Sequence, residues 1–338
     1  MSDTPYLYLL PGAVEHLRAG TLLTAAPGQA TRYAYAEAIV ALGRRHPDVV
    51  VLDADVAKSI GTTAFAAAFP ERSFNFGIAE QNMVAAAAGM ATTGLIPFVS
   101  SYAVFLTMRA LDQVRNSVHY PRLNVKFASS HGGITAGPDG PTHQGQEDLN
   151  LMRAIAGSTV VAPADPATTQ RATWAAAEWP GPVYLSFTRD PVPHLFAPDY
   201  PFAIGKAVVI REGSDATIVA IRDMVAQALV AAELLAARGL SVRVIDCHTL
   251  KPLDETTLLQ AARETGALVT AESNIGYGGL GSAVAELLVE QYPVPMQRIA
   301  LGDTFTESGP YLDLLEKYGM SAGHIAAAVE RVVGRKRA

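Results

Sequence analysis

The sequence predicts an α/β protein made of two domains, each with a parallel sheet. Three observations support this: apolar runs of strand length alternate with helical patterns, the alternation stops at one proline-rich stretch, and it then resumes. Apolar strands that alternate with helices form parallel sheets covered on both faces. The chain has 338 residues, of which 49% are hydrophobic, so each domain can bury a core of its own.

Each expected element of the first domain follows from its pattern. Continuous apolar or β-branched runs predict buried strands, and apolar residues repeating every three or four positions predict helices. In order, we expect a helix at 33–46, a strand at 49–55, a helix at 80–92, a strand at 96–101, a helix at 102–118, strands at 123–130 and 158–165, a helix at 166–178 and a strand at 181–187. These elements suffice for one open parallel sheet.

The proline-rich stretch at 189–201 breaks the pattern, and a second alternation follows it. We expect strands at 216–221, 241–246, 267–273 and 296–301, with helices at 224–239, near 255–264 and after Gly281. The chain is therefore divided into an N-terminal extension (1–30), a first domain (31–190), a linker (191–203) and a smaller second domain (204–338). The extension lacks periodicity, and we expect it to wrap a domain or contact a partner.

The composition excludes several classes of protein. A net charge of −6 argues against nucleic acid as a main partner, and the single cysteine, Cys247, excludes an intramolecular disulfide and a multi-cysteine metal site. One cysteine and no signal-peptide pattern indicate a cytoplasmic protein. The uncharged stretch 81–108 is broken by Gly94 and Pro97, so we expect buried core there and no membrane span.

Glu80 stands alone at the head of this uncharged stretch, and the next charged residue is Arg109. A buried carboxylate is costly unless it is paired, hydrogen-bonded or protonated. At the start of a helix it is stabilised by the helix dipole by roughly 0.3–1 kcal/mol. The position alone leaves two interpretations open: an acid in the first helical turn, or a group that exchanges a proton with a heteroaromatic nitrogen.

Three motifs in succession indicate a family: GIAEQNM (77–83), PFVSSYAVF (97–105) and GPDGPTHQGQEDL (137–149). This succession resembles the pyrimidine-binding domain of the transketolase family of thiamine diphosphate enzymes, and it is most similar to the separately encoded C-terminal half of a split transketolase. The resemblance covers roughly residues 32–335. It implies a pyrimidine-type thiamine diphosphate-binding domain followed by a smaller transketolase C-terminal domain.

The resemblance implies roles at the cofactor. In that family the glutamate that matches Glu80 hydrogen-bonds N1′ of the aminopyrimidine, which lets the 4′-nitrogen remove a proton from the thiazolium ring. Tyr102 and Phe105 match the aminopyrimidine pocket, with Phe105 as the stacking ring. Their spacing of three suggests that both lie on one helix face. The alternative for this pair is ordinary core aromatics.

The resemblance also implies a site for a sugar phosphate. Asp139 and His143 lie in a Gly- and Pro-rich segment that cannot form a regular helix, and their counterparts bind sugar, Asp139 through a hydroxyl and His143 through substrate or phosphate; we also expect His143 to take part in catalysis. Four further positions match substrate-binding residues: Arg32, Ser59, Arg189 and, most weakly, Asp55. Arginine suits phosphate because its planar fork donates two parallel hydrogen bonds. Taken singly, each of Arg32, Ser59 and Arg189 is better explained as an ordinary surface residue, whereas the three matches together favour a phosphorylated sugar.

One part of a thiamine diphosphate site is missing. Members of the family hold the diphosphate and Mg²⁺ with a GDG motif followed at a distance by Asn, and this chain has no GDG. We therefore expect no metal ligands here and infer that thiamine diphosphate is shared with an N-terminal transketolase subunit that supplies the Mg²⁺ and diphosphate ligands. By family symmetry the assembly would be α2β2. The Ala- and Gly-rich helix after Glu80 would let another helix approach closely.

The second domain departs from the family in two places. Glu-His usually precedes the GGLGSAV motif, whereas this chain has Ser273 and Asn274. Thr-Gly is usual where this chain has Ile221 and Arg222. These departures leave the catalytic residues untouched, but they make the contacts around Arg222 uncertain from sequence.

The function implied is that of a transferase: the C-terminal subunit of a split transketolase, which moves a two-carbon ketol unit from a ketose phosphate to an aldose or aldose phosphate. Three alternatives stay open. They are a subunit with 1-deoxyxylulose-5-phosphate synthase chemistry, the β subunit of a 2-oxo acid dehydrogenase, and a non-catalytic scaffold descended from such an enzyme. The presence of Glu80, Asp139, His143, Arg32 and Arg189 argues against the scaffold. The sequence does not name the sugar.

Overall fold

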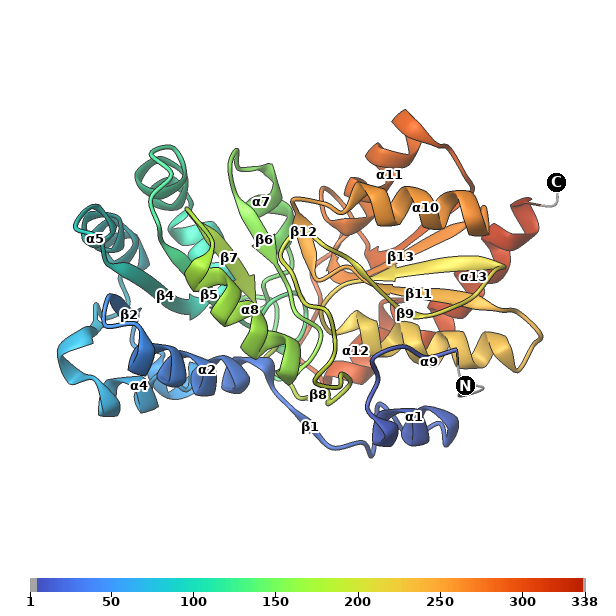
Figure 1. Ribbon diagram of the computed structural model, residues 1–338, viewed down its shortest axis with the longest axis horizontal. Coiled ribbons are helices and arrows are strands. Elements are labelled where there is room, and N and C mark those ends of the chain that lie inside the picture. Colours follow the sequence, from blue (N-terminus) through green and yellow to red (C-terminus); the bar gives the residue numbers. More distant parts are fainter. Residues whose placement is uncertain (1–4, 337–338) are drawn as a thin grey trace.

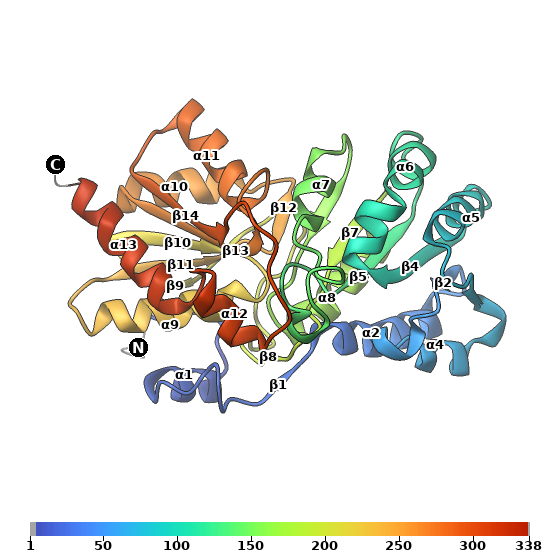
Figure 2. The same cartoon turned by 180° about the vertical axis from the view of Figure 1, so that it is seen from behind.

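The computed structural model describes residues 5–336 and consists of two α/β units that lie side by side (Figure 1). Seen from behind, each unit again has a sheet between helices (Figure 2). The predicted fold class, two α/β domains with mainly parallel sheets, is confirmed. Among the described residues no helix is both long enough and apolar enough to cross a membrane.

The first unit is built on a seven-stranded sheet in the order β12-β6-β7-β5-β4-β2-β3. All neighbours are parallel except β12, which runs antiparallel to β6. The strands are β2 (Val49–Asp53), β3 (Ser73–Asn75), β4 (Ile96–Tyr102), β5 (Lys126–Ser130), β6 (Thr159–Val161), β7 (Val183–Ser186) and β12 (Thr249–Lys251). Strand β12 belongs to the predicted second domain (204–338), yet it pairs with β6 in the sheet of the first unit. The predicted domain limits stay a prediction.

Helices cover both faces of the first sheet. Alternate residues of β2 point to opposite sides: Val51 packs with α2 and α8, and Leu52 packs with α5 and α7. The helical segments are α2 (Thr31–Arg45), α3 (Ala57–Ile60), α4 (Thr63–Ala68), η1 (Pro70–Arg72), α5 (Glu80–Thr92), η2 (Phe105–Arg109), α6 (Leu111–Gln113), η3 (Val114–His119), η4 (Gly137–Asp139), α7 (Asp148–Ala154) and α8 (Pro166–Glu178). Helix α8 has the bounds predicted from sequence, because Asp165 caps it and Pro166 opens it.

The second unit has a five-stranded sheet in the order β14-β13-β10-β11-β9, with β9 antiparallel. Its strands are β9 (Val208–Arg211), β10 (Ala216–Ala220), β11 (Val242–Asp246), β13 (Leu268–Ile275) and β14 (Met296–Leu301). Its helices are α9 (Met224–Ala236), α10 (Glu255–Thr265), α11 (Leu280–Gln291), α12 (Tyr311–Lys317) and α13 (Ala322–Lys336). Helices α9 and α13 share one face of the sheet, and α10 and α11 cover the other.

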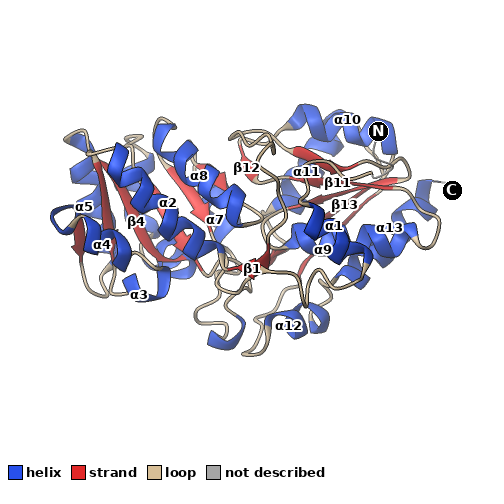
Figure 3. Ribbon diagram, turned by 60° about the horizontal axis from the view of Figure 1, so that its bottom comes forward, coloured by secondary structure: helices blue, strands red, loops and turns tan. Residues whose placement is uncertain are grey.

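The N-terminal segment contains a helix that the sequence pattern did not predict, α1 (Pro11–Arg18), which Pro11 opens. The segment runs along the second unit, where Tyr6 bridges to Arg211 and α1 packs near α9 (Figure 3). It then enters the first unit through β1 (Gly28–Gln29), which pairs with β8 (Val192–Pro193) in the predicted linker. The expectation that this segment wraps a domain is confirmed for the described residues; residues 1–4 lie outside them.

Candidate functional site

The predicted site residues gather at one edge of the first sheet. Strands β2, β4, β5 and β7 are parallel. Tyr102 is the last residue of β4, and the segments that follow β2, β5 and β7 carry Ser59, His131 and Arg189. In open α/β sheets, ligands bind in the crevice outside the carboxyl ends of the strands. The topology therefore brings together residues that are far apart in the sequence.

Glu80 is the first residue of α5, and its side chain is only 1% exposed. Its Oε2 accepts a hydrogen bond from Nη1 of Arg109 at 2.8 Å. The guanidinium group of Arg109 also lies over the Phe105 ring, 4.4 Å from the ring centre. The buried carboxylate is thus paired with a cation that is itself 43% exposed, and an aromatic face lies beside the pair.

Tyr102 and Phe105 form a stacked pair with ring centres 5.4 Å apart. The reason given from sequence for their proximity is wrong, because Tyr102 is the last residue of β4 and does not lie on a helix. Phe105 begins η2, a π-helical turn that ends at Arg109, and a second π-helical segment, η3, follows. Such turns are frequent at functional sites because they shift the side chains that come after them.

His131 belongs to this site, although the sequence analysis missed it. Its ring stacks on Tyr102 with centres 3.7 Å apart, and its backbone has a φ of 66°, which is unusual for a residue other than glycine. Burial, together with the nearby guanidinium groups of Arg32 and Arg189, lowers the pKa of His131 to about 2. The ring is therefore neutral. The signal in the sequence was one histidine between a predicted strand and a Gly-Gly pair.

Asp139 connects His131 to Arg189. One carboxylate oxygen, Oδ2, lies 3.5 Å from Nε2 of His131 and 3.4 Å from Nε of Arg189. Because His131 is neutral, the first contact is a polar contact and the second is an ion pair. Arg189 also donates to Asp190 at 2.7 Å, and this hydrogen bond raises the pKa of Arg189. A cation and a carboxylate thus lie beside the aromatic rings.

Arg32 reaches the site from the other side. Its Nη1 donates to Oγ of Ser59 at 3.1 Å, and the same oxygen accepts a hydrogen bond from the Tyr102 hydroxyl at 2.9 Å. Two hydrogen bonds hold the segments that carry the two arginines side by side: the amide of Thr31 donates to Oγ1 of Thr188, and the amide of Thr188 donates to Oγ1 of Thr31. Arg32 and Arg189 directly follow these threonines.

His143 meets the same rings edge-on, at 5.5 Å from Phe105 and 6.1 Å from Tyr102 between ring centres. Its Nδ1 lies 2.9 Å from Oγ1 of Thr142. Asp55 is the exception. Its backbone amide donates to Asn75 at 3.2 Å, and among the described residues no hydrogen bond or ion pair links Asp55 to the other predicted positions. The structure brings together every predicted residue except Asp55.

Two protein-family models match the sequence of this chain. The transketolase pyrimidine-binding domain matches residues 28–194, and the transketolase C-terminal domain matches residues 205–325. The chain belongs to the transketolase family. The predicted family is confirmed, and the family implies thiamine diphosphate as cofactor.

The relatives of this transketolase chain include separately encoded subunits. It is 42% identical over 305 residues to the 6-deoxy-6-sulfo-D-fructose transketolase subunit of Clostridium sp. (strain MSTE9), covering 90% of this chain and 95% of that protein. A solved structure described as a split gene transketolase, inactive beta4 tetramer, shares 48% identity with a TM-score of 0.85, covering 92% of this chain and 100% of that one. The chain is the C-terminal section of a split transketolase, a transferase subunit for ketol transfer.

Another relative shows how the same section occurs inside a longer enzyme. The chain is 39% identical over 306 residues to the 1-deoxy-D-xylulose-5-phosphate synthase of Syntrophotalea carbinolica (strain DSM 2380 / NBRC 103641 / GraBd1), covering 90% of this chain and 48% of the synthase. The chain therefore spans about half the length of that synthase. In the synthase this section is joined to a second half. The likeness to split transketolase subunits implies a partner subunit.

Glu80 and Phe105 fit the aminopyrimidine half of thiamine diphosphate. A buried carboxylate beside a half-buried aromatic ring, that of Phe105, can take the edge and the ring of an aminopyrimidine. A diphosphate with Mg²⁺ needs several hard oxygen ligands. Within residues 5–336 no group of three or more His, Cys, Asp or Glu side chains is arranged to hold a metal ion.

Proposed function

We propose that this chain supplies the pyrimidine-binding and sugar-binding half of a transketolase active site that transfers a two-carbon ketol unit between anionic sugars. The observation that carries the proposal is the continuous run of contacts from Glu80 through Arg109, Phe105 and Tyr102 to His131. This run links the group suited to the cofactor with those suited to the sugar. Thiamine diphosphate, when bound, supplies the electron sink for cleaving the C–C bond next to a ketone.

Glu80 is the proposed partner of N1′ of the aminopyrimidine. Its burial and its place in the first turn of α5 support a fixed carboxylate that can share a proton with a ring nitrogen. Phe105 provides the stacking face, and Tyr102 is held against it by its hydrogen bond to Ser59. Arg109 contacts both Glu80 and Phe105, so the cofactor ring would have to displace or share these contacts.

The sugar site is proposed around two arginines and two polar side chains. Arg32 and Arg189 offer the planar donors that suit a tetrahedral oxyanion, and Asp139 can accept from a sugar hydroxyl. His143 lies at the ring edges and can donate to substrate or exchange a proton with it. Asp55 is proposed to join the sugar site only when the partner subunit is bound, because its backbone amide donates to Asn75.

The terminal anion of the sugar is either a phosphate or a sulfonate. The Clostridium relative is named for 6-deoxy-6-sulfo-D-fructose, and both groups present tetrahedral oxygens to arginine. A ketose phosphate is the proposed donor. The sulfonated ketose belongs in the same substrate panel, because the charges of the site do not separate the two.

The proposed partner is an N-terminal transketolase subunit with a GDG…Asn motif, which would hold the diphosphate and Mg²⁺ in an α2β2 assembly. Two exposed apolar side chains beside the site support a covering subunit: Ile78, which is 75% exposed and lies two residues before Glu80, and Met108, which is 47% exposed and precedes Arg109. The single free cysteine, Cys247, is buried, which is compatible with a cytoplasmic location.

Two other activities share this architecture and are tested together with the main proposal. Synthase chemistry has support in the 39% identity to the 1-deoxy-D-xylulose-5-phosphate synthase, but that relative is about twice as long as this chain. The β subunit of a 2-oxo acid dehydrogenase and a non-catalytic scaffold would each leave the proposed sugar-binding side chains Asp139, Arg189 and Arg32 without a role.

The experiment is to purify the chain with its N-terminal partner and to assay three reactions with thiamine diphosphate and Mg²⁺. These are ketol transfer from a ketose phosphate or sulfonated ketose to an aldose phosphate, synthase condensation from pyruvate, and oxidative decarboxylation of a 2-oxo acid. Ketol transfer alone supports the proposal. Condensation from pyruvate would replace it with the synthase, and no turnover in an assembled complex that binds the cofactor would favour the scaffold.

A further inference from the structure

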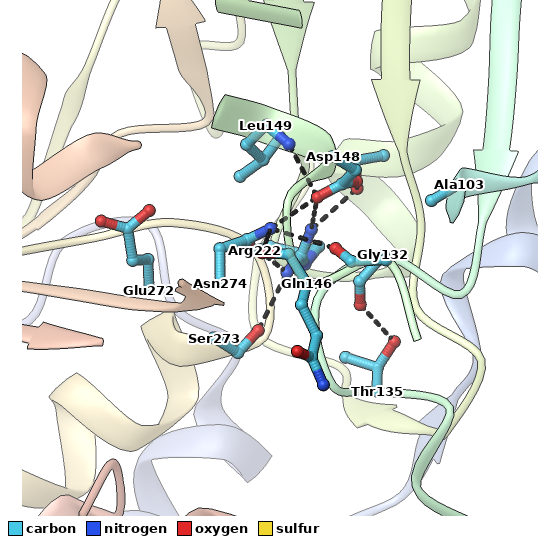
Figure 4. A network of polar contacts seen from close by, with 12 residues as sticks. Ala103, Gly132, Thr135, Gln146, Asp148, Leu149, Arg222, Glu272, Ser273 and Asn274 are labelled. Carbon is cyan, nitrogen blue, oxygen red and sulfur yellow. Dashed lines mark hydrogen bonds and ion pairs between the residues drawn. The ribbon is translucent and has the colours of Figure 1, made fainter. Parts of the chain in front are cut away.

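Arg222 is fully buried and lies at the junction of the two units (Figure 4). Its three guanidinium nitrogens donate to four side chains: Nε to Asp223 at 2.9 Å, Nη1 to Ser186 at 2.8 Å, and Nη2 to Ser273 at 2.9 Å and Asn274 at 2.8 Å. The two departures from the family pattern, at 222 and at 273–274, are therefore one network.

The charge of Arg222 is compensated inside the protein. Its Nη1 lies 3.6 Å from Oδ1 of Asp148, and Asp223 is hydrogen-bonded to its Nε. Burial alone would lower the pKa of Arg222, but these two carboxylates raise it above the ordinary value, so the side chain stays charged. Breaking a buried ion pair leaves an uncompensated charge and is costly, so these contacts hold the Arg222 side chain in one position.

Arg222 touches the start of the segment that carries the proposed sugar-binding residues. A Cβ atom on Gly132 would lie 2.6 Å from Nη1 of Arg222, and a Cβ atom on Gly133 would lie 2.1 Å from Nη2. Only glycines allow the backbone to come this close, and Gly133 also has a φ of 58°. These glycines directly follow His131.

Asn274 touches the other end of the same segment. Its Nδ2 donates to the carbonyl of Gly145 at 3.2 Å, to the carbonyl of Gln146 at 3.1 Å and to Oδ1 of Asp148 at 2.6 Å. Arginine can only donate hydrogen bonds, so the amide oxygen of Asn274 must face Arg222 and the amide nitrogen must face the segment. Arg222 thereby sets the orientation of Asn274.

We propose that Arg222 and Asn274 are positioning residues for the substrate loop, defined as residues 131–148. Arg222 contacts the start of this loop, and Asn274 donates hydrogen bonds to its end. The loop carries Asp139 and His143, and its ends are joined by two backbone bonds: Gly133 N to Gly145 O at 2.9 Å, and Gly145 N to His131 O at 3.0 Å. The second domain thus sets the geometry of sugar binding in the first. This inference rests on the proposed function, since it concerns the proposed sugar site.

The test compares two neighbouring variants in the assembled complex. Asn274→Ala removes the three donations to the loop, whereas the control Ser273→Ala removes bonds to Arg222 and Asp223 only. We expect Asn274→Ala to raise KM for the anionic ketose donor about five- to tenfold with kcat within about twofold, and Ser273→Ala to leave KM within about twofold. A purely structural role would lower the active fraction, hence kcat, and would leave KM alone.

A second measurement does not depend on activity. Hydrogen exchange of the loop amides should be at least about tenfold faster in Asn274→Ala and in Arg222→Lys than in wild type or in Ser273→Ala, because lysine keeps the charge but lacks the planar fork. Equal KM values and equal exchange in all four proteins would overturn the positioning role. A wild-type complex without ketol transfer would overturn the proposed function instead. The exchange data would still test whether Arg222 and Asn274 hold the substrate loop.

Discussion

Arg109 donates to Glu80 across a stretch of sequence that contains no other charged residue. The two residues that bound this stretch are therefore each other's partners. The uncharged residues between them form α5, β4 and most of η2. The buried sides of these elements pack into the core, and the two charges meet at its edge. The isolated acid before the uncharged segment, Glu80, is thus explained by the cation that follows the segment, Arg109.

This pairing predicts an energetic coupling. Arg109→Met should lower the free energy of unfolding by about 1–2 kcal/mol, because Glu80 is left buried without its donor while Arg109 itself is half exposed. Glu80→Gln should reduce the cost of the arginine substitution. Chemical denaturation of the two single variants and the double variant measures the coupling, and strictly additive effects would show that the ion pair is unimportant.

Glu80→Gln also tests the catalytic assignment. The amide keeps the shape of the side chain but cannot accept a proton, so we expect kcat to fall by about 10²–10⁴-fold in the assembled complex. Elution of the complex in size-exclusion chromatography should be unchanged. Rates like those of wild type in an intact, cofactor-loaded complex would remove Glu80 from the mechanism.

Much of the fold could be predicted because alternating apolar runs and helical patterns are local signals. Helix α8 has the predicted bounds, since its capping aspartate and its proline lie next to each other in the sequence. The π-helical turns between Phe105 and His119 could not be predicted, because apolar spacing does not separate them from an ordinary helix. Strand β12 joins the first sheet through a contact between distant segments, for which the sequence carries no local signal.

The site was predictable where motifs have a fixed spacing and unpredictable elsewhere. Glu80, Phe105 and Asp139 were found through motifs, whereas His131 is a single histidine before two glycines. Arg222 and Asn274 looked like unrelated departures, since a charge that is compensated by residues far away along the chain can be recognised only in three dimensions.

Arg189 should govern affinity for the anionic group of the sugar. Its guanidinium is 30% exposed and can add an anion to its contacts with Asp139 and Asp190. We expect Arg189→Met to raise KM for the phosphorylated donor by about 10- to 100-fold, the size of a charged hydrogen bond, and to affect the dephosphorylated ketose by less than about threefold. The control is Arg238→Met, which removes a surface ion pair with Glu330. Equal losses on both sugars would assign Arg189 a structural role.

His131 should make the protein less stable in acid. The pKa of this histidine falls from 6.5 in the ordinary state to about 2 in the fold, so the unfolded chain binds more protons below pH 6.5. Stability contributed by the neutral ring is present above pH 6.5 and is lost as the pH falls below it.

The variant His131→Phe keeps an aromatic ring against Tyr102 and removes this titration. Between pH 6.5 and about 5, wild type should lose about 1–2 kcal/mol more than the variant. Urea unfolding at several pH values measures the difference. The raised pKa of Glu272 acts in the opposite direction in both proteins and therefore cancels. Parallel pH profiles would mean that the pKa of His131 is the same in the fold as in the unfolded chain.

Gly133→Ala should be among the most damaging small substitutions in the chain. The new Cβ would lie 2.1 Å from Nη2 of Arg222 and 2.6 Å from Oγ of Ser273, at a φ of 58°. Gly157→Ala is a matched control, because Gly157 has a φ of 73° but no atom within 4 Å of its would-be Cβ. The control should cost about 1–2 kcal/mol for the left-handed backbone, and Gly133→Ala about 1–3 kcal/mol more for the steric clash. Urea unfolding compares them, and equal costs would show that Arg222 can withdraw from the loop without penalty.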